Sequence, residues 1–284
     1  MLFRLLGSSY TVTTLTGGDV NSAALAENAS EKLVIKWKHS ASAGLFEAEA
    51  DGLGRLRSTG TLRVPEVIEF DDSSDPAWLA MEYIELKPPT DYRRFGRNLA
   101  DGLAALHQSS PSPTGQFGLD RNNFLGSQPQ NNDWSNKWHV FYRDRRLVPQ
   151  VQRAQRAGFI STERSRLLDR VITNIEALLD GFSAEPVLIH GDLWSGNFLA
   201  NGDEPVLIDP AVYFAEREVE IAYTELFSGF PPGFHDAYQQ TFPLNGGYDR
   251  RRPLHQLYPL LIHLNHFGEA YGPSVDNACR MLLR

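Results

Sequence analysis

The hydrophobic pattern of residues 186–213 predicts three short strands that bring polar residues together. Each strand is a brief apolar run between polar or turn-forming residues, and the runs span residues 187–189, 198–200 and 206–208. Asn201-Gly202 separates the second run from the third, and Asn-Gly between apolar runs is typical of a type I′ hairpin turn. Such a hairpin would place Asn197 and Asp209 side by side, with Asp192 just upstream in the loop.

The N-terminal part of the chain has a pattern that predicts a small, β-rich lobe. The predicted strands span residues 10–15, 23–26, 33–37, 63–70 and 78–83. Residues 42–57 form a predicted helix because Leu45, Leu53 and Leu56 share one face, and Glu49 interrupts that apolar stripe. The proline-containing segment after residue 83 predicts a linker between two lobes.

The rest of the chain has patterns that predict a larger, mainly helical lobe. An apolar stripe from Tyr92 to Leu106, preceded by a capping Thr90 or Asp91, predicts a helix that ends near residue 109. Further helical patterns span residues 161–179, 218–222 and 254–267, with a kink expected at Pro259. Residues 111–149 are expected to be rich in loops. We therefore predict an α+β fold of two lobes, residues 1–84 and 85–284.

Composition and charge narrow the classes of function. With 284 residues, 42% hydrophobic and 22% charged, the chain can hold two lobes and has an ordinary globular composition. The formal net charge of −8 disfavours nucleic acid as a partner, because phosphate backbones attract basic surfaces. No apolar run approaches the ~20 residues that cross a bilayer, so we expect no membrane partner. The single cysteine, Cys279, cannot form an internal disulfide, which favours a cytoplasmic location.

The polar residues around the predicted hairpin match the spacing that kinases use for phosphoryl transfer. His190, Asp192 and Asn197 satisfy the pattern H-x-D-x-x-x-x-N, and Asp209 stands where kinases have a metal-binding aspartate. Asp192 is then the catalytic residue that accepts the proton of the attacking hydroxyl. Asn197 and Asp209 would hold Mg²⁺ against the phosphates of ATP. The plainer alternative is an ordinary hairpin with polar ends.

Two departures from the protein-kinase pattern indicate a small-molecule acceptor. Gly191 replaces the usual arginine, and Asp209-Pro210-Ala211 stands in place of Asp-Phe-Gly. This segment therefore lacks the phenylalanine that switches a regulated activation loop. The spacing together with these departures predicts a bilobal, protein-kinase-like fold that serves a small-molecule phosphotransferase.

The N-terminal lobe supplies the candidate ATP-binding residues. Gly17 and Gly18 would let backbone N–H groups approach a phosphate, although a plain hairpin turn has the same pattern. Lys36 lies on an apolar strand at kinase-like distance from this loop, where the alternative is a solvated edge lysine. Glu49 on an inward helix face needs a cationic partner, and Lys36 is the best candidate. Backbone groups at the start of the linker are expected to contact adenine, at Glu82, Tyr83 and Ile84.

Aromatic and amide side chains in residues 122–142 form a candidate acceptor site. Asn123, Trp134 and Trp138 belong to this group, and aromatic faces with amides suit the CH patches and hydroxyls of a sugar. Aromatic residues at helical spacing are as typical of a core, so that alternative stays open. His263 and His266 are interpreted as packing or substrate-pocket residues.

Several distinctive stretches occur along essentially the whole chain, and they are HGDLWSGN, IDPA, GGD, VIKW, RSTGTLRVPEV, AMEY and NNFLGSQPQNNDW. Together they resemble the fructosamine kinase (ketosamine-3-kinase) family, which shares its fold with aminoglycoside and choline kinases. The resemblance implies an ATP- and Mg²⁺-dependent kinase that phosphorylates the 3-hydroxyl of ketosamines, which are fructosamine or ribulosamine adducts of amines or protein lysines. The resemblance also implies a role in deglycation repair. It implies that Asp192 is the base, that Asn197 and Asp209 are the magnesium ligands, and that Lys36 and Glu49 position the phosphates. It also implies that Trp194 lies on the substrate side.

The residues themselves leave other functions open. One alternative is another sugar, choline or aminoglycoside phosphotransferase, and a different class is a nucleotide-binding pseudokinase scaffold. The complete set of kinase residues counts against a scaffold, which does not need a base. An aminoglycoside site should be strongly acidic. Residues 133–146, in and next to the candidate acceptor site, instead have two acidic residues, Asp133 and Asp144, against four basic ones, which are Lys137, Arg143, Arg145 and Arg146.

The glycine loop also bears on the oligomeric state that we expect. Some members of the family carry a redox-responsive cysteine in this loop, whereas Gly17-Gly18-Asp19-Val20 contains none. The basis for a disulfide-linked dimer is therefore missing, and we expect a monomer.

Overall fold

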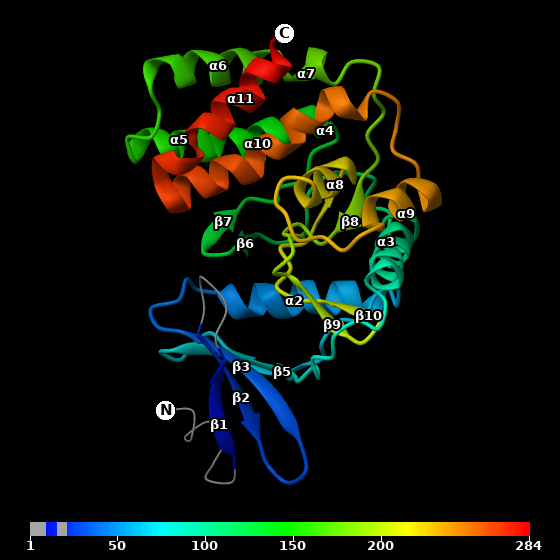
Figure 1. The fold of residues 1–284 in the computed structure, drawn as a ribbon. Coiled ribbons are helices and arrows are strands. Elements are labelled where there is room, and N and C mark those ends of the chain that lie inside the picture. Colours follow the sequence, from blue (N-terminus) through cyan, green and yellow to red (C-terminus); the bar gives the residue numbers. More distant parts are fainter. Residues whose placement is uncertain (1–9, 16–21) are drawn as a thin grey trace.

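The computed structural model describes residues 10–15 and 22–284, which form two lobes (Figure 1). The N-terminal lobe contains a five-stranded antiparallel sheet in the order β1-β2-β3-β5-β4. Its strands are β1 (Thr11–Leu15), β2 (Ser22–Glu27), β3 (Lys32–Lys38), β4 (Val67–Asp71) and β5 (Ala77–Glu82). Helix α2 (Leu45–Ser58) packs on this sheet and lies between it and the larger lobe. The predicted α+β architecture of two lobes is confirmed.

Helix α2 starts at Leu45, three residues later than the sequence predicts. Gly44 precedes it in a left-handed conformation, with φ of 76°, and offers no side chain as a cap. The carboxylate of Asp72 accepts hydrogen bonds from the N–H groups of Phe46 and Glu47 instead. The leucines of the predicted stripe are buried, so the inward face that carries Glu49 is oriented as expected.

Helix α3 (Tyr92–Ser109) opens the larger lobe. The Asp91 side chain caps it by accepting hydrogen bonds from the N–H groups of Arg93 and Arg94. Tyr92 is 58% exposed and lies outside the buried stripe, in contrast to the prediction. The predicted boundary after Ile84 falls between β5 and α3, and the division into two domains stays a prediction.

Strands β9 (Phe198–Asn201) and β10 (Glu204–Leu207) form the predicted hairpin, but its turn is shifted by one residue. Asn201 pairs with Glu204, so Gly202 and Asp203 form the turn. Gly202 has a positive φ of 64°, as the first central residue of a type II′ turn requires. Beyond the last strand pair, the Ile208 N–H donates to the Asn197 carbonyl over 3.0 Å, which places Asp209 beside Asn197 as predicted.

The buried strand β8 (Val187–Ile189) leads into the loop that begins at His190. It pairs in antiparallel fashion with β11 (Tyr213–Ala215), a strand that the sequence pattern did not reveal. Residues of both strands are buried. The two segments that carry Asp192 and Asp209 are therefore fixed to each other within the core of the larger lobe.

Residues 111–149 are more regular than the predicted loop-rich segment. They contain the hairpin of β6 (Asn123–Leu125) and β7 (Gln128–Gln130), which reverses at Gly126 with φ of 58°. Helix α4 (Trp138–Phe141) continues into the π-helix η1 (Tyr142–Leu147) and then into α5 (Val148–Arg156). The interpretation as loop was wrong here because these helices are short and carry arginines that disguise their buried faces.

The remaining helices belong to the larger lobe (Figure 1). They are α6 (Thr162–Thr173), α7 (Ile175–Leu178), α8 (Glu218–Thr224), α9 (Phe234–Thr241), α10 (Tyr248–Phe267), the 3-10 helix η2 (Gly268–Tyr271) and α11 (Gly272–Leu282). Of these helices, α8 lies in the interior of the lobe. The single helix predicted for residues 161–179 is divided at Asn174. Among the described residues, no helix combines the length and apolar character that crossing a bilayer requires.

Candidate active site

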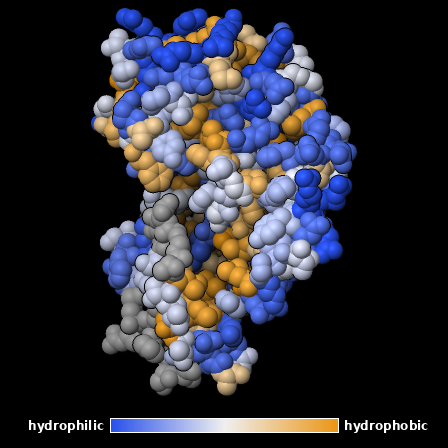
Figure 2. Space-filling view, viewed as in Figure 1, coloured by the Kyte–Doolittle hydropathy of each residue, from blue (hydrophilic) through white to orange (hydrophobic). Residues whose placement is uncertain are grey.

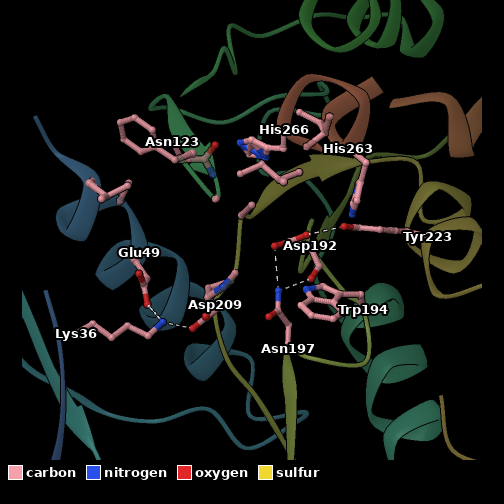
Figure 3. Close-up of a pocket in the computed structure, with 18 of the residues that line it drawn as sticks. Lys36, Glu49, Asn123, Asp192, Trp194, Asn197, Asp209, Tyr223, His263 and His266 are labelled. Atoms are coloured by element: carbon pink, nitrogen blue, oxygen red, sulfur yellow. Dashed lines mark hydrogen bonds and ion pairs between the residues drawn. The ribbon is translucent and has the colours of Figure 1, made fainter. Parts of the chain in front are cut away.

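A cleft of about 200 Å³ lies between the two lobes, and most of the predicted kinase residues line it. Figure 2 shows this face of the molecule hollowed between the lobes, with hydrophobic surface gathered beside the hollow. The polar residues come from β3, α2, the loop after β8 and the segment after β10 (Figure 3). They are Lys36, Glu49, Asp192, Asn197 and Asp209.

Lys36 stands at the centre of a three-residue ion cluster in the cleft. Its ammonium group lies 2.6 Å from Glu49 Oε1 and also contacts the Asp209 carboxylate. Burial alone would lower the pKa of Lys36, but the negative charges of Asp209 and Glu49 outweigh burial and raise it. Lys36 is therefore charged and directed at the two carboxylates, and the predicted Lys36–Glu49 pair is present.

The carboxylate of Asp192 is held through both of its oxygens. Tyr223 donates its hydroxyl to Oδ1 over 2.9 Å, and Asn197 donates its amide to Oδ2 over 3.0 Å. Burial raises the pKa of Asp192 to about 7, although the hydrogen bonds from Tyr223 and Asn197 act to lower it. A carboxylate with a pKa near neutrality, pointing into a cleft, suits a general base.

The loop that carries Asp192 is anchored from behind by Glu220 of α8, which the sequence analysis missed. The buried carboxylate of Glu220 accepts hydrogen bonds from the backbone N–H groups of His190 and Gly191. The His107 ring lies 2.9 Å from the same carboxylate. A glutamate flanked by the apolar residues Val219 and Ile221 was the signal that could have revealed it.

Position 191 requires a glycine because the backbone there lies very close to the segment after Asp209. Gly191 has φ of 84°, and a Cβ atom there would lie 2.1 Å from the carbonyl oxygen of Ala211. An arginine at this position, as in protein kinases, would therefore force the two segments apart. The departure from the protein-kinase pattern has a steric cause.

Asn197 and Asp209 form an oxygen-donor pair that fits a hard cation such as Mg²⁺. Asn197 uses its amide nitrogen on Asp192, and within the described residues its side-chain oxygen accepts no hydrogen bond. The Asp209 side chain is 40% exposed toward the cleft. The described residues contain no group of three or more His, Cys, Asp or Glu side chains that could hold a metal ion. Two protein ligands complemented by phosphates and water are typical of Mg²⁺ in kinases.

The residues predicted to contact adenine are not among those that line the cleft, and they are Glu82, Tyr83 and Ile84. Gly17 and Gly18, which were predicted to approach a phosphate, lie outside the described residues. The Glu82 N–H donates to the Glu66 carbonyl over 2.8 Å, so it belongs to the sheet and is not free for a nucleotide. Ile84 is buried, and adenine contacts from the remaining backbone groups of Glu82, Tyr83 and Ile84 stay a prediction.

Asn123 lines the cleft, but its polar atoms bind the protein. Its amide nitrogen donates to the Val212 carbonyl over 2.7 Å, and its oxygen accepts hydrogen bonds from Gln130 and Asn132. These contacts hold the segment that follows Asp209. The structure thus gives Asn123 a supporting role, and because the residue also lines the cleft, its contact with the substrate stays a prediction.

Trp134 and Trp138 do not line the cleft. Trp138 is 4% exposed and packs against Phe117 and Tyr142, while Trp134 stacks on Phe214. The helical spacing of these aromatic residues reflects core packing, which was the alternative interpretation. The structure therefore gives both tryptophans a structural role in place of the predicted substrate contact.

The rest of the cleft wall comes from several distant segments. Trp194 is 38% exposed and lines the cleft with Asp192, and its place on the substrate side stays a prediction. His263 lies on the last turns of α10, and burial lowers its pKa (Figure 3). Further residues that the sequence did not assign to this wall are Phe124, Leu125, Tyr223, Ile262 and Phe267. They carry no shared motif, which explains why the pattern did not reveal them.

A sheet lobe that carries a lysine–glutamate pair, facing a helical lobe that carries Asp192, Asn197 and Asp209, defines a kinase-like phosphotransferase. The sequence model of the fructosamine kinase family matches residues 6–284. The chain belongs to the fructosamine kinase family.

Individual relatives agree with this assignment. The "probable ketoamine kinase" of Enterococcus faecium is 39% identical over 270 residues, covering 93% of this chain and 92% of that protein. Its counterpart in Vibrio parahaemolyticus is 35% identical over 260 residues, covering 90% of this chain and 87% of that protein.

Solved structures give the same picture of the fold. The crystal structure of a proposed fructosamine-3-kinase from Thermobifida fusca is 34% identical, with a TM-score of 0.84, covering 96% of this chain and 93% of that one. An aminoglycoside phosphotransferase in a ternary complex with AMP-PNP and hygromycin B shares the fold, with a TM-score of 0.68 at 16% identity. The structural match covers 99% of this chain and 96% of the aminoglycoside phosphotransferase chain.

Proposed function

We propose that this protein is an ATP-dependent kinase that phosphorylates the 3-hydroxyl of ketosamines, as a step in deglycation repair. The observation that carries the proposal is the meeting of the two carboxylates Asp192 and Asp209 with Lys36 in one cleft. Membership of the fructosamine kinase family supports the ketosamine as the acceptor.

Each polar residue of the cleft has a part in the proposed reaction. Lys36, oriented by Glu49, binds the phosphates of ATP. Asn197 and Asp209 hold Mg²⁺, which neutralises phosphate charge when it is bound. Asp192 accepts the proton of the acceptor hydroxyl as that oxygen bonds to the γ-phosphorus and the bond to the leaving ADP oxygen breaks.

The composition of the cleft favours a ketosamine over a polycationic antibiotic. The carboxylates that line the described part of the cleft are Glu49, Asp192 and Asp209, and each already has a role in catalysis or nucleotide binding. The rest of the cleft wall, which we assign to the acceptor, is mostly aromatic and apolar, with Trp194 and Phe267 exposed. Its polar residues include His263 and His266. The charge count of residues 133–146 does not bear on this choice, because those residues do not line the cleft.

We further propose that the enzyme acts as a cytoplasmic monomer on free or protein-bound ketosamines, without a nucleic-acid or membrane partner. The buried single cysteine, Cys279, and the acidic net charge of −8 support this setting.

A panel of acceptors tests the proposal. Purified protein with ATP and Mg²⁺ is offered ribulosyl-lysine, fructosyl-lysine, free ribose, choline and kanamycin, and ADP release and the phosphate position are measured. We expect transfer to the 3-hydroxyl of a ketosamine and essentially none to kanamycin. Faster transfer to kanamycin or choline would overturn the proposal, and absence of transfer to every acceptor would favour a pseudokinase scaffold.

A further inference from the structure

Tyr223 of α8 contacts the carboxylate of Asp192 from the wall of the cleft. Its hydroxyl donates to Asp192 Oδ1 over 2.9 Å, and its ring lines the cleft (Figure 3). The residue is 6% exposed, and its ring packs edge-on against Phe227 at 5.9 Å between centroids. The phenol is therefore fixed in place and aimed at one atom of the catalytic residue.

The same face of α8 holds both the backbone and the side chain of the catalytic loop. Glu220 lies three residues before Tyr223, so the two side chains project from neighbouring positions on the helix. Glu220 accepts hydrogen bonds from the N–H groups of His190 and Gly191, while Tyr223 binds the side chain of Asp192. One short helix thus fixes the position of the loop and the orientation of its carboxylate.

The second hydrogen bond to this carboxylate comes from a residue with another task. Asn197 donates to Asp192 Oδ2, but its own side-chain oxygen is the proposed ligand of Mg²⁺. Tyr223 has no such double role, and burial raises its pKa well above the usual value, so its hydroxyl remains a donor. Tyr223 can therefore hold Asp192 whatever the nucleotide site contains.

We propose that Tyr223 is a positioning residue that holds Asp192 in the orientation in which it accepts the acceptor proton. The inference rests on the proposed phosphoryl transfer. Without the hydroxyl, the carboxylate keeps one hydrogen bond and gains rotational freedom, so it spends less time aligned with the acceptor. Misplacement of a reacting group by ~1 Å can lower a rate by about 100-fold. Tyr223 makes no hydrogen bond to Lys36 or Asp209, so ATP binding does not depend on its hydroxyl.

The test is the substitution Tyr223→Phe, which removes one oxygen atom and keeps the ring. We expect kcat for ribulosyl-lysine to fall by about 10-fold or more, with KM values for MgATP and the acceptor within about two-fold of wild type. The matched control is Tyr142→Phe, which removes another buried hydroxyl, one that binds the carbonyl groups of Leu254 and His255. The control should keep kcat even if its thermal stability falls.

A double-mutant cycle with Asp192→Ala separates positioning from a general structural role. Tyr223→Phe should change the residual rate by less than about two-fold when Asp192 is already absent, because its effect acts through that carboxylate. An unchanged kcat in Tyr223→Phe, an equal loss in Tyr142→Phe, or the same loss with and without Asp192 would overturn the inference. If the wild type phosphorylates a different acceptor of the panel, the ketosamine proposal fails. The role of Tyr223 is then decided by the same double-mutant cycle, measured with that acceptor or with water.

Discussion

Asp209 illustrates how one residue of the site is held in an unusual conformation for its task. Its φ of 56° lies in the left-handed region, which residues other than glycine seldom adopt. Neighbouring contacts impose this conformation, since the Ala211 N–H donates to the His190 carbonyl and Asn123 binds the Val212 carbonyl. The side chain is thereby directed at Lys36 and into the cleft.

Substitution of Asp209 should separate metal-dependent from metal-independent nucleotide binding. Asp209→Ala removes a charged oxygen ligand, and we expect the affinity for MgATP, measured by calorimetry, to fall by about 10-fold or more. Binding of ATP without metal should not fall, because Lys36 loses an anionic competitor for the phosphates. Unchanged MgATP affinity in the variant would remove Asp209 from the metal site.

At the scale of single residues, the spacing along the sequence predicted the site residues that belong to one motif. It missed the residues that reach the site singly from a distant helix. Asp192, Asn197 and Asp209 could be predicted because their order reflects one loop and one hairpin. Tyr223 and Glu220 approach the loop from a distant helix, and a sequence does not show which helix face meets which loop. Three-dimensional packing decides such contacts.

Helix α8 is the element on which the catalytic loop depends. Its buried Glu220 has three hydrogen-bond partners, two of them backbone N–H groups of the loop. A buried acceptor of this kind stabilises the loop because the N–H groups would otherwise lack partners away from water. The loop therefore depends on the α8 helix as much as on strand β8.

Replacement of Glu220 should lower the free energy of unfolding as well as turnover. Glu220→Gln keeps the size but replaces one accepting oxygen by a donor, which faces an N–H group and leaves it unpaired. We expect the free energy of unfolding, from urea titration, to fall by about 1.5–3 kcal/mol. The control is Glu225→Gln, next to the C-terminal end of α8, where the partner is the partly exposed Arg252. Equal stability of the two variants would show that the Glu220 network contributes little.

Elements with a clear period or turn signal were predicted, whereas among the short buried ones β8 and α8 were predicted and others were missed. Helix α2, helix α3 and the β9–β10 hairpin follow from apolar stripes and from Asn-Gly, although the turn moved to Gly202-Asp203. Strand β11 and the π-helix η1 are too short for periodicity to distinguish. The aromatic run at residues 134–142 was compatible with either a core or a sugar site, and packing against Phe117 and Phe214 decided for the core.

At the scale of the whole molecule, the two lobes are joined by contacts inside the cleft and at the β9–β10 hairpin. Lys36 of the sheet lobe pairs with Asp209 of the larger lobe. Elsewhere the Leu207 N–H donates to the Arg63 carbonyl, and the Lys87 N–H donates to the Ala200 carbonyl, so the β9–β10 hairpin binds both the sheet lobe and the linker. The hairpin that places Asn197 beside Asp209 therefore also helps to set the orientation of the two lobes.

The central claim is that this cleft transfers phosphate with Asp192 as the base. The most direct measurement compares Asp192→Asn with the wild type, using calorimetry for MgATP and product formation for a ketosamine acceptor. We expect MgATP affinity to be retained, because Lys36, Asn197 and Asp209 remain, and turnover to fall by about 10²–10⁴-fold. A variant that transfers phosphate at the wild-type rate would contradict the assignment of the base and, with it, the proposed mechanism.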